Sequence, residues 1–503
     1  MKKTLWGLAT IAATMLLAAC GDKADNCEIL GAVPADADYA VTFNPTAFIE
    51  SAGGSVTDGE ITLPAALTDN IGTAASEMTD FFQFIHEAGI STETSALFGY
   101  LSNGSAPIIV TSYADYDKLV ATLEANEFTP QANPMGSLEI YGAETNIVGL
   151  TESYMMFSTG NYAETVIGLM ESAANQIADK STLAGTPMGR ALTAEASDLA
   201  FAMTYSENMI NSFARGMQMP TMLLDMFKGA IVCGTFKLSD NSLTGTVRSL
   251  DADGKPIDIM ATGLYTSAPA NVSDKALSYL GDDQQMVLAF NLKGLDWNTL
   301  FNDYLIPNVS RSERVAISLA RTYLEKFDGT VALGLGVTDG MTSFRNLDAN
   351  IDPGKQFSAT LVLETAPGQA EGLMTDIRSL LDSTGLPYTS ADGGLSVDLS
   401  GVTVYAAVKD NMIIVSNNPV SDRHSNDAVK QSHMADYCNA FAIYLPEDSK
   451  LMSDLGLHYS VSLYGVSDTK AAEGRLNITI KDGTSRKFLE KAINLAMDIQ
   501  KAI

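Results

Sequence analysis

The chain has 503 residues, and its 60 acidic against 31 basic side chains give a formal net charge of −29 at pH 7. This charge repels polyanions, so nucleic acid is not expected as a partner. A chain of this length exceeds what one hydrophobic core usually holds, and at least two domains are expected.

The N-terminus has the pattern of a bacterial lipoprotein signal. Two lysines precede an apolar run that ends in the sequence LAAC at Cys20, and this run is too short to span a bilayer. We predict a signal peptide over residues 1–19, lipidation of Cys20, and a tether over residues 20–29. Acyl chains on Cys20 would hold the mature protein on a membrane. The predicted location is the cell envelope, at the outer membrane, on its periplasmic face or at the cell surface.

Three further cysteines follow the predicted lipidation site. Cys27, Cys233 and Cys438 are an odd number, so at most one intramolecular disulfide can form among them. No disulfide framework of a small secreted domain is expected, and the pairing stays open.

Taken in chain order, the predicted elements occur twice. The first strand, in "ADADYAVTFNP" (35–45), has a counterpart in "GDDQQMVLAFNL" (281–292). We expect Asp36 and Asp283 at equivalent turn positions, where a short carboxylate can accept hydrogen bonds from nearby backbone amides. The repetition indicates an internal duplication.

Three later segments support the duplication in the same order. A strand and an amphipathic helix at 106–128 match those at 357–386, and a strand meander at 138–161 matches one at 395–419. Two alternating strands joined by a Ser-Asp turn follow in each half, within 230–260 and 459–489. One such match is weak evidence, whereas three in the same order favour a tandem plan.

This plan predicts an α+β fold of two homologous tandem lobes. Successive hairpins favour mainly antiparallel sheets, with helices packed on one face and the other face partly solvated. Lobe 1 is expected over 30–265, a linker over 266–275, and lobe 2 over 276–503.

The signal, the strand opening and the tandem plan together resemble an uncharacterised family of lipoproteins of roughly 500 residues in Bacteroidota, known as a domain of unknown function. The resemblance covers the whole mature chain. It implies a cell-envelope location and supplies no activity, cofactor or site residue.

No catalytic motif is present in the sequence. It lacks a Gly-x-Ser-x-Gly elbow and a His-Glu-x-x-His pair, and it has four histidines in all. The glycines of "GLGVTDG", Gly334 and Gly336, open no helix, so they do not indicate phosphate binding. No catalytic residue and no cofactor is predicted.

Two partial metal-binding patterns are better explained as polar loops. His424, His433 and Cys438 are ligand types that suit zinc, but their spacing fits no compact zinc finger. The segment "LDANIDPG" (347–354) begins like a calcium loop but lacks the turning glycine and the twelfth-position glutamate. We therefore predict no metal site.

One insertion distinguishes the first half from the second. The segment 206–230 has no equivalent of its length in the second half, and it carries a methionine-rich apolar face. Such a surface can adapt to varied apolar partners, although completing the core is the other interpretation. The candidate partner-binding residues are Met209, Phe213, Met217, Met222 and Met226.

These observations favour a non-enzymatic binding or scaffolding module, held on a membrane by its lipid. Its partner would be an envelope protein or a small ligand. An envelope hydrolase with a carboxylate site between the lobes is one alternative, and surface glycan binding is another.

Overall fold

We describe a computed structural model of the chain. The structure describes residues 26–502 except 58–59, 65–67, 69–72, 102–106, 133–137, 160–162, 208, 212–226, 306–310, 339–355, 392, 421–425 and 470–471. Two compact units are present. Unit 1 runs to Pro256 and includes Thr484–Asn494, and unit 2 comprises Ile257–Gly483 and the residues from Leu495 onward.

This division differs from the predicted domain boundaries. The chain passes from unit 1 to unit 2 after Pro256, about ten residues before the expected linker. The expected linker is itself built into unit 2: Val272 is buried, the Cys438 thiol donates to the carbonyl of Pro269, and the Ser273 hydroxyl caps a helix by accepting from the amide of Ala276. Residues 266–275 are therefore part of the fold of unit 2.

Unit 1 contains an antiparallel sheet with the strand order β6-β7-β8-β9-β5-β4-β1-β10-β11-β12. Its strands are β1 (Tyr39–Phe43), β4 (Ile90–Gly99), β5 (Ile108–Tyr113), β6 (Thr129–Gln131), β7 (Glu139–Ala143), β8 (Asn146–Leu150), β9 (Tyr154–Thr159), β10 (Leu199–Thr204), β11 (Ile231–Leu238) and β12 (Ser242–Leu250). The hairpin of β2 (Ser55–Thr57) and β3 (Glu60–Thr62) pairs separately.

The helical elements of unit 1 are α2 (Asn26–Ile29), η1 (Leu30–Ala32), α3 (Pro45–Ser51), α5 (Thr73–Glu87), α6 (Tyr116–Ala125), α7 (Ala163–Ala178), η3 (Leu183–Gly185) and α8 (Pro187–Leu192). They cover both faces of the sheet. Ile147 of β8 packs in a core with Met170 of α7, whereas the next residue, Val148, packs with Phe84 of α5 and Leu119 of α6. Successive strand side chains point to opposite faces, so α7 lies on one face, and α5 and α6 lie on the other.

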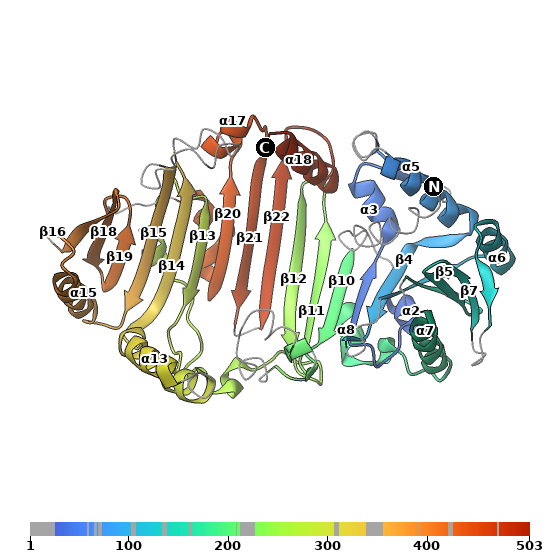
Figure 1. Cartoon of the computed structure of the whole chain (residues 1–503), viewed down its shortest axis with the longest axis horizontal. Helices are drawn as coiled ribbons and strands as arrows, with labels where there is room; N and C mark the ends of the chain where they lie inside the picture. Colours follow the sequence, from blue (N-terminus) through green and yellow to red (C-terminus); the bar gives the residue numbers. More distant parts are fainter. Residues whose placement is uncertain are drawn as a thin grey trace. The chain divides into compact units, whose positions relative to one another are not determined.

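The strands of unit 2 are also paired antiparallel, in the order β16-β17-β18-β19-β15-β14-β13-β20-β21-β22. Figure 1 shows most of these strands side by side. They are β13 (Met286–Asn291), β14 (Phe327–Val337), β15 (Phe357–Thr365), β16 (Tyr388–Ala391), β17 (Gly394–Leu399), β18 (Val402–Lys409), β19 (Met412–Ser416), β20 (Asn439–Leu445), β21 (Ser460–Asp468) and β22 (Glu473–Lys481).

The helical elements of unit 2 are η4 (Ile259–Thr262), α11 (Asp274–Leu277), α12 (Trp297–Thr299), η5 (Leu300–Leu305), α13 (Arg311–Leu324), α15 (Ala370–Thr384), α16 (Asp427–Ser432), η8 (Met434–Asp436) and α17 (Lys450–Leu455). The last helix, α18 (Phe488–Ala502), is divided between the two units.

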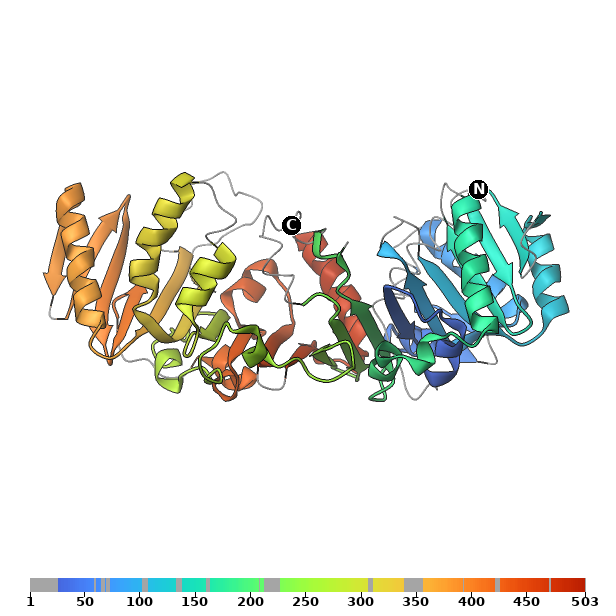
Figure 2. The same ribbon diagram turned by 90° about the horizontal axis from the view of Figure 1, so that it is seen from below.

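Helices also lie on both faces of the sheet in unit 2. Ile414 of β19 packs with α11 and α16, whereas Ile413 beside it packs with Leu373 of α15. In Figure 2, α13 (yellow) and α15 (orange) rise from the strands of unit 2 as separate helices. The predicted antiparallel sheets are confirmed. The placement of all helices on one face was wrong, because the sheet carries apolar residues on both sides.

The two strand orders correspond one to one, with β1 matching β13, β4 to β9 matching β14 to β19, and β10 to β12 matching β20 to β22. The same cross-strand pair of a phenylalanine and a glycine also occurs at matching places in both units. Phe201 of β10 pairs with Gly234 of β11, and Phe441 of β20 pairs with Gly465 of β21. In both cases a Cβ on the glycine would overlap the phenylalanine ring.

Among the described residues, no helix combines the length and the apolar character needed to cross a membrane.

Candidate functional site

The structure tests few of the predicted site residues. Cys20, Phe213, Met217, Met222 and Met226 lie outside the described residues. Met209 is described, and its side chain is only 4% exposed. For this residue, therefore, the core interpretation fits and the partner-surface interpretation was wrong, because a buried side chain offers no surface to a partner.

Of the two polar patterns considered as metal sites, only His433 and Cys438 lie in the described residues. The backbone of His433 ends α16 in the left-handed conformation, and the Cys438 thiol is buried against a carbonyl. His424 and residues 347–354 lie outside the described residues. Across the positions that the structure describes, no group of three metal-ligating side chains gathers.

The glycine-rich strand segment of β14 has a packing role. Gln284 is 2% exposed and lies over Gly334, where a Cβ would overlap its Oε1 atom. Its Nε2 donates to Thr360 Oγ1 at 2.8 Å, and its Oε1 accepts from the amide of Gly281 at 2.9 Å. The glycine therefore makes room for a buried amide that holds the start of β13 in place.

A cavity of unit 1 lies between the sheet and helices α3 and α5. Its volume is about 90 Å³, which is below the usual range of small-molecule pockets of about 300–1,000 Å³, so it has room for a small apolar group or for one end of a larger ligand. The described residues that line it are Phe43, Pro45, Ile49, Ile61, Phe81, Phe82, Phe84, Ile85, Ile90, Ser91, Thr92, Ser95, Ile109, Thr111, Val148, Met155 and Phe157. Almost all of the wall is apolar.

Local sequence places the two helices that cover this cavity. Asn44 begins α3 by accepting a hydrogen bond from the amide of Ala47, and Pro45 occupies the first helical position, where its missing amide hydrogen costs nothing. The run "DFFQFI" at the end of α5 then places Phe81, Phe84 and Ile85 at the cavity wall. Figure 1 shows α3 and α5 beside β4.

The few polar groups at the cavity wall bond to one another. Ser95 Oγ donates to Thr111 Oγ1 at 3.1 Å, and Thr111 Oγ1 donates to the carbonyl of Ser91 at 3.3 Å. Thr46 Oγ1 lies 3.0 Å from both the carbonyl and the hydroxyl oxygen of Thr92. Because these groups already have partners, none of them requires a polar ligand atom for its satisfaction.

No ionisable side chain is among the described residues that line the cavity. A carboxylate or ammonium group placed there would lose its hydration without gaining an opposite charge, which is strongly unfavourable. The cavity therefore suits an uncharged apolar group and offers no general acid, base or nucleophile with a shifted pKa.

No pattern in the sequence predicted this cavity. The available signal was the three phenylalanines of "DFFQFI" on a helix that follows a short polar hairpin, and it was indistinguishable from an ordinary core helix. The size of the gap between a helix and a sheet depends on tertiary packing and has no periodic pattern.

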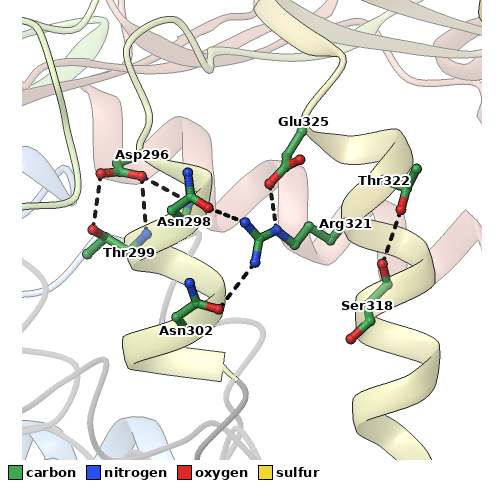
Figure 3. A network of polar contacts seen from close by, with 8 residues as sticks. All are labelled: Asp296, Asn298, Thr299, Asn302, Ser318, Arg321, Thr322 and Glu325. Carbon is green, nitrogen blue, oxygen red and sulfur yellow. Dashed lines mark hydrogen bonds and ion pairs between the residues drawn. The ribbon is translucent and has the colours of Figure 1, made fainter.

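Unit 2 has a polar cluster at the equivalent place in its chain, between its first two strands (Figure 3). Arg321 of α13 donates to the side-chain oxygens of Asn298 and Asn302 and pairs with Glu325. Its guanidinium also lies 5.8 Å from the ring centroid of Phe301, so one side chain fastens α13 to α12 and η5.

The same cluster caps α12. Asp296 accepts from the amide of Asn298 at 2.9 Å, and from the amide and hydroxyl of Thr299, both at 3.1 Å. The pKa of Asp296 is lowered, mainly because its carboxylate accepts the backbone hydrogen bond from Thr299, with a smaller effect of Arg321.

Comparison with known proteins identifies no family for this chain. No protein-family model matches it, and no curated protein does. Among solved structures, crystal form I of TP0453 aligns with 11% identity and a TM-score of 0.28, over 47% of this chain and 83% of that chain. Crystal form III of TP0453 aligns with 13% identity and a TM-score of 0.25, over 48% of this chain and 88% of that chain. Likenesses this weak carry no argument about fold or function, so the chain is assigned to no family.

Proposed function

We propose that this protein is a lipid-anchored cell-envelope protein that binds an apolar ligand in the cavity of unit 1 and catalyses no reaction. The observation that carries the proposal is the cavity itself, with its apolar wall and its mutually bonded hydroxyl groups. The anchor is the predicted lipid on Cys20, and the location is the outer membrane.

We also propose that the two units arose by duplication of one ancestral domain. Support comes from the matching strand orders and from the phenylalanine-glycine pairs at equivalent places. A duplicated binding domain can keep its first role in one copy while the other diverges, which agrees with the different helices that follow β1 and β13.

A hydrolase is less well supported than a binding protein at this cavity. Its described wall contains hydroxyl groups but no carboxylate or imidazole that could activate them, and hydroxyl nucleophiles need such a base. A hydrolytic site elsewhere and a glycan site stay predictions that the cavity does not favour.

The test is a ligand titration with a matched pair of variants. The soluble chain 20–503 with Cys20→Ser would be titrated with N-phenyl-1-naphthylamine, an uncharged apolar probe that fluoresces when it leaves water. Saturable binding is expected. Ile85→Trp should place an indole in the cavity and exclude at least two probe carbon atoms, each worth about 0.8 kcal/mol. Affinity should then fall by roughly tenfold or more.

The control is Leu380→Trp, which makes a similar change at a side chain of unit 2 that is 63% exposed. Circular dichroism would verify that both variants fold. Equal affinities for the two folded variants, or the lack of any saturable binding to the parent chain, would refute the cavity as the ligand site.

A further inference from the structure

A cavity lies in unit 2 between α11 and the segment formed by α16 and η8. Its volume is about 330 Å³, within the usual range of small-molecule sites of about 300–1,000 Å³. Leu277 of α11 and Met434 of η8, only 4% and 0% exposed, form part of its wall. The polar part of the wall includes Asp274, Lys430, His433 and Asp436. We call it the unit 2 cavity.

The helices on either side of this cavity have counterparts in unit 1. α16 corresponds to α8, because their caps, Asn426 and Thr186, lie at the same distance in sequence before β20 and β10, and each accepts from the amide three residues on. α11 corresponds to α2 and η1, since Leu277 and Leu30 lie at the same distance before β13 and β1. The place between α11 and α16 can therefore be compared with the place between η1 and α8.

In unit 1 the chain itself fills this place. The amide of Leu183 in η3 donates to the carbonyl of Val33 beside η1 at 2.8 Å, and the Thr186 hydroxyl donates to the carbonyl of Leu183 at 2.8 Å. Leu183 is 1% exposed and packs in the same core as Leu30. A Cβ on Gly189 of α8 would overlap the Leu183 carbonyl, so η3 lies directly against α8.

Unit 2 has a shorter connection at this point. The chain from β9 to α8 holds α7 and η3, whereas residues 417–426 alone join β19 to α16. This stretch is shorter than the 16 residues of α7 by itself, so it cannot hold counterparts of both elements. Val429 of α16, at the position of Gly189, lines the unit 2 cavity. The shorter connection therefore accounts for a cavity in unit 2 where unit 1 has a packed leucine.

The charges at the wall of the unit 2 cavity favour an organic cation. Asp274 and Asp436 are exposed carboxylates, whereas the ammonium group of Lys430 lies 3.3 Å from the carboxylate of Asp427. Acidic groups therefore outnumber basic ones here, and the net charge of −29 of the chain also attracts cations. Asp274, His433 and Asp436 do not form a group that could hold a metal ion, which favours a longer molecule with a charge at one end.

We infer that the unit 2 cavity binds a primary aliphatic amine. The carboxylates of Asp274 and Asp436 attract its ammonium group, which has three hydrogen-bond donors. The alkyl chain packs on Leu277 and Met434, where the hydrophobic effect stabilises it. The inference goes beyond the proposed function, because it gives unit 2 a ligand of a different class from that of unit 1.

The experiment measures ligand protection of a cysteine in the cavity wall. Ser278, another residue of this wall, would be changed to Cys in the soluble chain with Cys20→Ser and Cys27→Ser, whose other two cysteines are buried. Its alkylation by iodoacetamide at pH 7 would be followed against the concentration of pentan-1-amine. The rate should fall along a saturation curve, by about tenfold at a concentration about ten times the Kd.

Matched variants control for alkylation and for charge. Ser318→Cys, at an exposed position of α13, should be alkylated at the same rate with and without the amine. In the Ser278→Cys chain, Asp274→Asn and Asp436→Asn should each raise the Kd by roughly fivefold, as expected for a partly exposed ion pair. Asp382→Asn removes the same charge from an exposed position of α15 and should leave the Kd unchanged.

Each outcome supports or overturns the inference. Protection at position 278 by pentan-1-amine, with none by pentan-1-ol or pentanoate at the same concentration, would support an amine site. Equal protection by pentan-1-ol would refute recognition of the ammonium group. No saturable protection by the amine, or the same Kd for all three Asn variants, would refute the site. These results are independent of probe binding to unit 1, so the proposed function stands or fails separately.

Discussion

The hydroxyl groups of Ser95 and Thr111 are hydrogen-bonded at the wall of the unit 1 cavity. Substituting these two residues should destabilise unit 1 by unequal amounts. Thr111→Val removes a hydroxyl that accepts from Ser95 and donates to the carbonyl of Ser91, so both groups lose a partner. Ser95→Ala removes only a donor, and Thr111 keeps its bond to the carbonyl. The double variant removes both members of the buried pair.

The expected costs follow from burial. Ser95 and Thr111 are 5% and 4% exposed, and a buried polar group left without a partner costs about 1–3 kcal/mol. We expect the free energy of unfolding of unit 1 to fall by about 2 kcal/mol with Thr111→Val and by about 1 kcal/mol with Ser95→Ala. Both values are within the ordinary range for the loss of one buried hydrogen bond. The double variant should lose about 1 kcal/mol, less than the sum, because no orphaned hydroxyl remains.

The assay is urea unfolding followed by two signals. Trp297 is the one tryptophan left after residue 20 and lies in unit 2, so its fluorescence reports that unit, whereas circular dichroism reports both. The transition seen by circular dichroism alone should move, with the tryptophan transition unchanged. A double variant as unstable as the sum of the two single variants would show that the pair is not coupled and would refute the reasoning.

Three further predictions concern other sites. Gly334→Ala should destabilise unit 2 by about 1–3 kcal/mol because its Cβ overlaps the side chain of Gln284, and Gln284→Ala should restore part of the loss in Trp297-monitored unfolding. Burial raises the pKa of the Cys233 thiol, so the folded state holds this proton more tightly than the unfolded state. The contribution of the protonated Cys233 thiol to the free energy of unfolding is therefore complete below about pH 8.5, and it is lost as pH rises through the folded pKa. Alkylation of Cys233 should stay slow at pH 8.5 until urea unfolds unit 1. Arg321→Ala should free α13 and speed proteolytic cleavage of that helix, whereas Arg321→Lys should restore it only in part because lysine lacks the planar fork.

The sequence was informative where a structural feature follows from local alternation. Strands β1 and β13 were found because apolar residues alternate beside a turn, and their repetition led to the tandem plan. The role given to Asp36 and Asp283 was wrong. Asp36 accepts from the Tyr100 hydroxyl, and Asp283 Oδ1 has no partner within the described part of the chain. Turn composition identifies the turn but does not determine which group its carboxylate meets.

The sequence does contain a signal for helices on both faces of the sheet. The segment "NIVGL" of β8 is buried at every position, and a strand without polar alternation indicates cover on both sides. The cavity had no comparable signal, since the phenylalanines of α5 would read the same over a closed core. Its existence depends on how far a helix stands from a sheet, which only the tertiary structure determines.

The phenylalanine-glycine pairs link the changes that this sequence tolerates at two positions. A side chain at Gly234 or Gly465 would displace the ring of Phe201 or Phe441 that lies over it, so glycine is favoured for as long as the aromatic residue is present. The two positions of each pair should therefore vary together among natural relatives. If the two units arose by the proposed duplication, this shared restraint would keep the same pair in both units long after the surrounding residues had diverged.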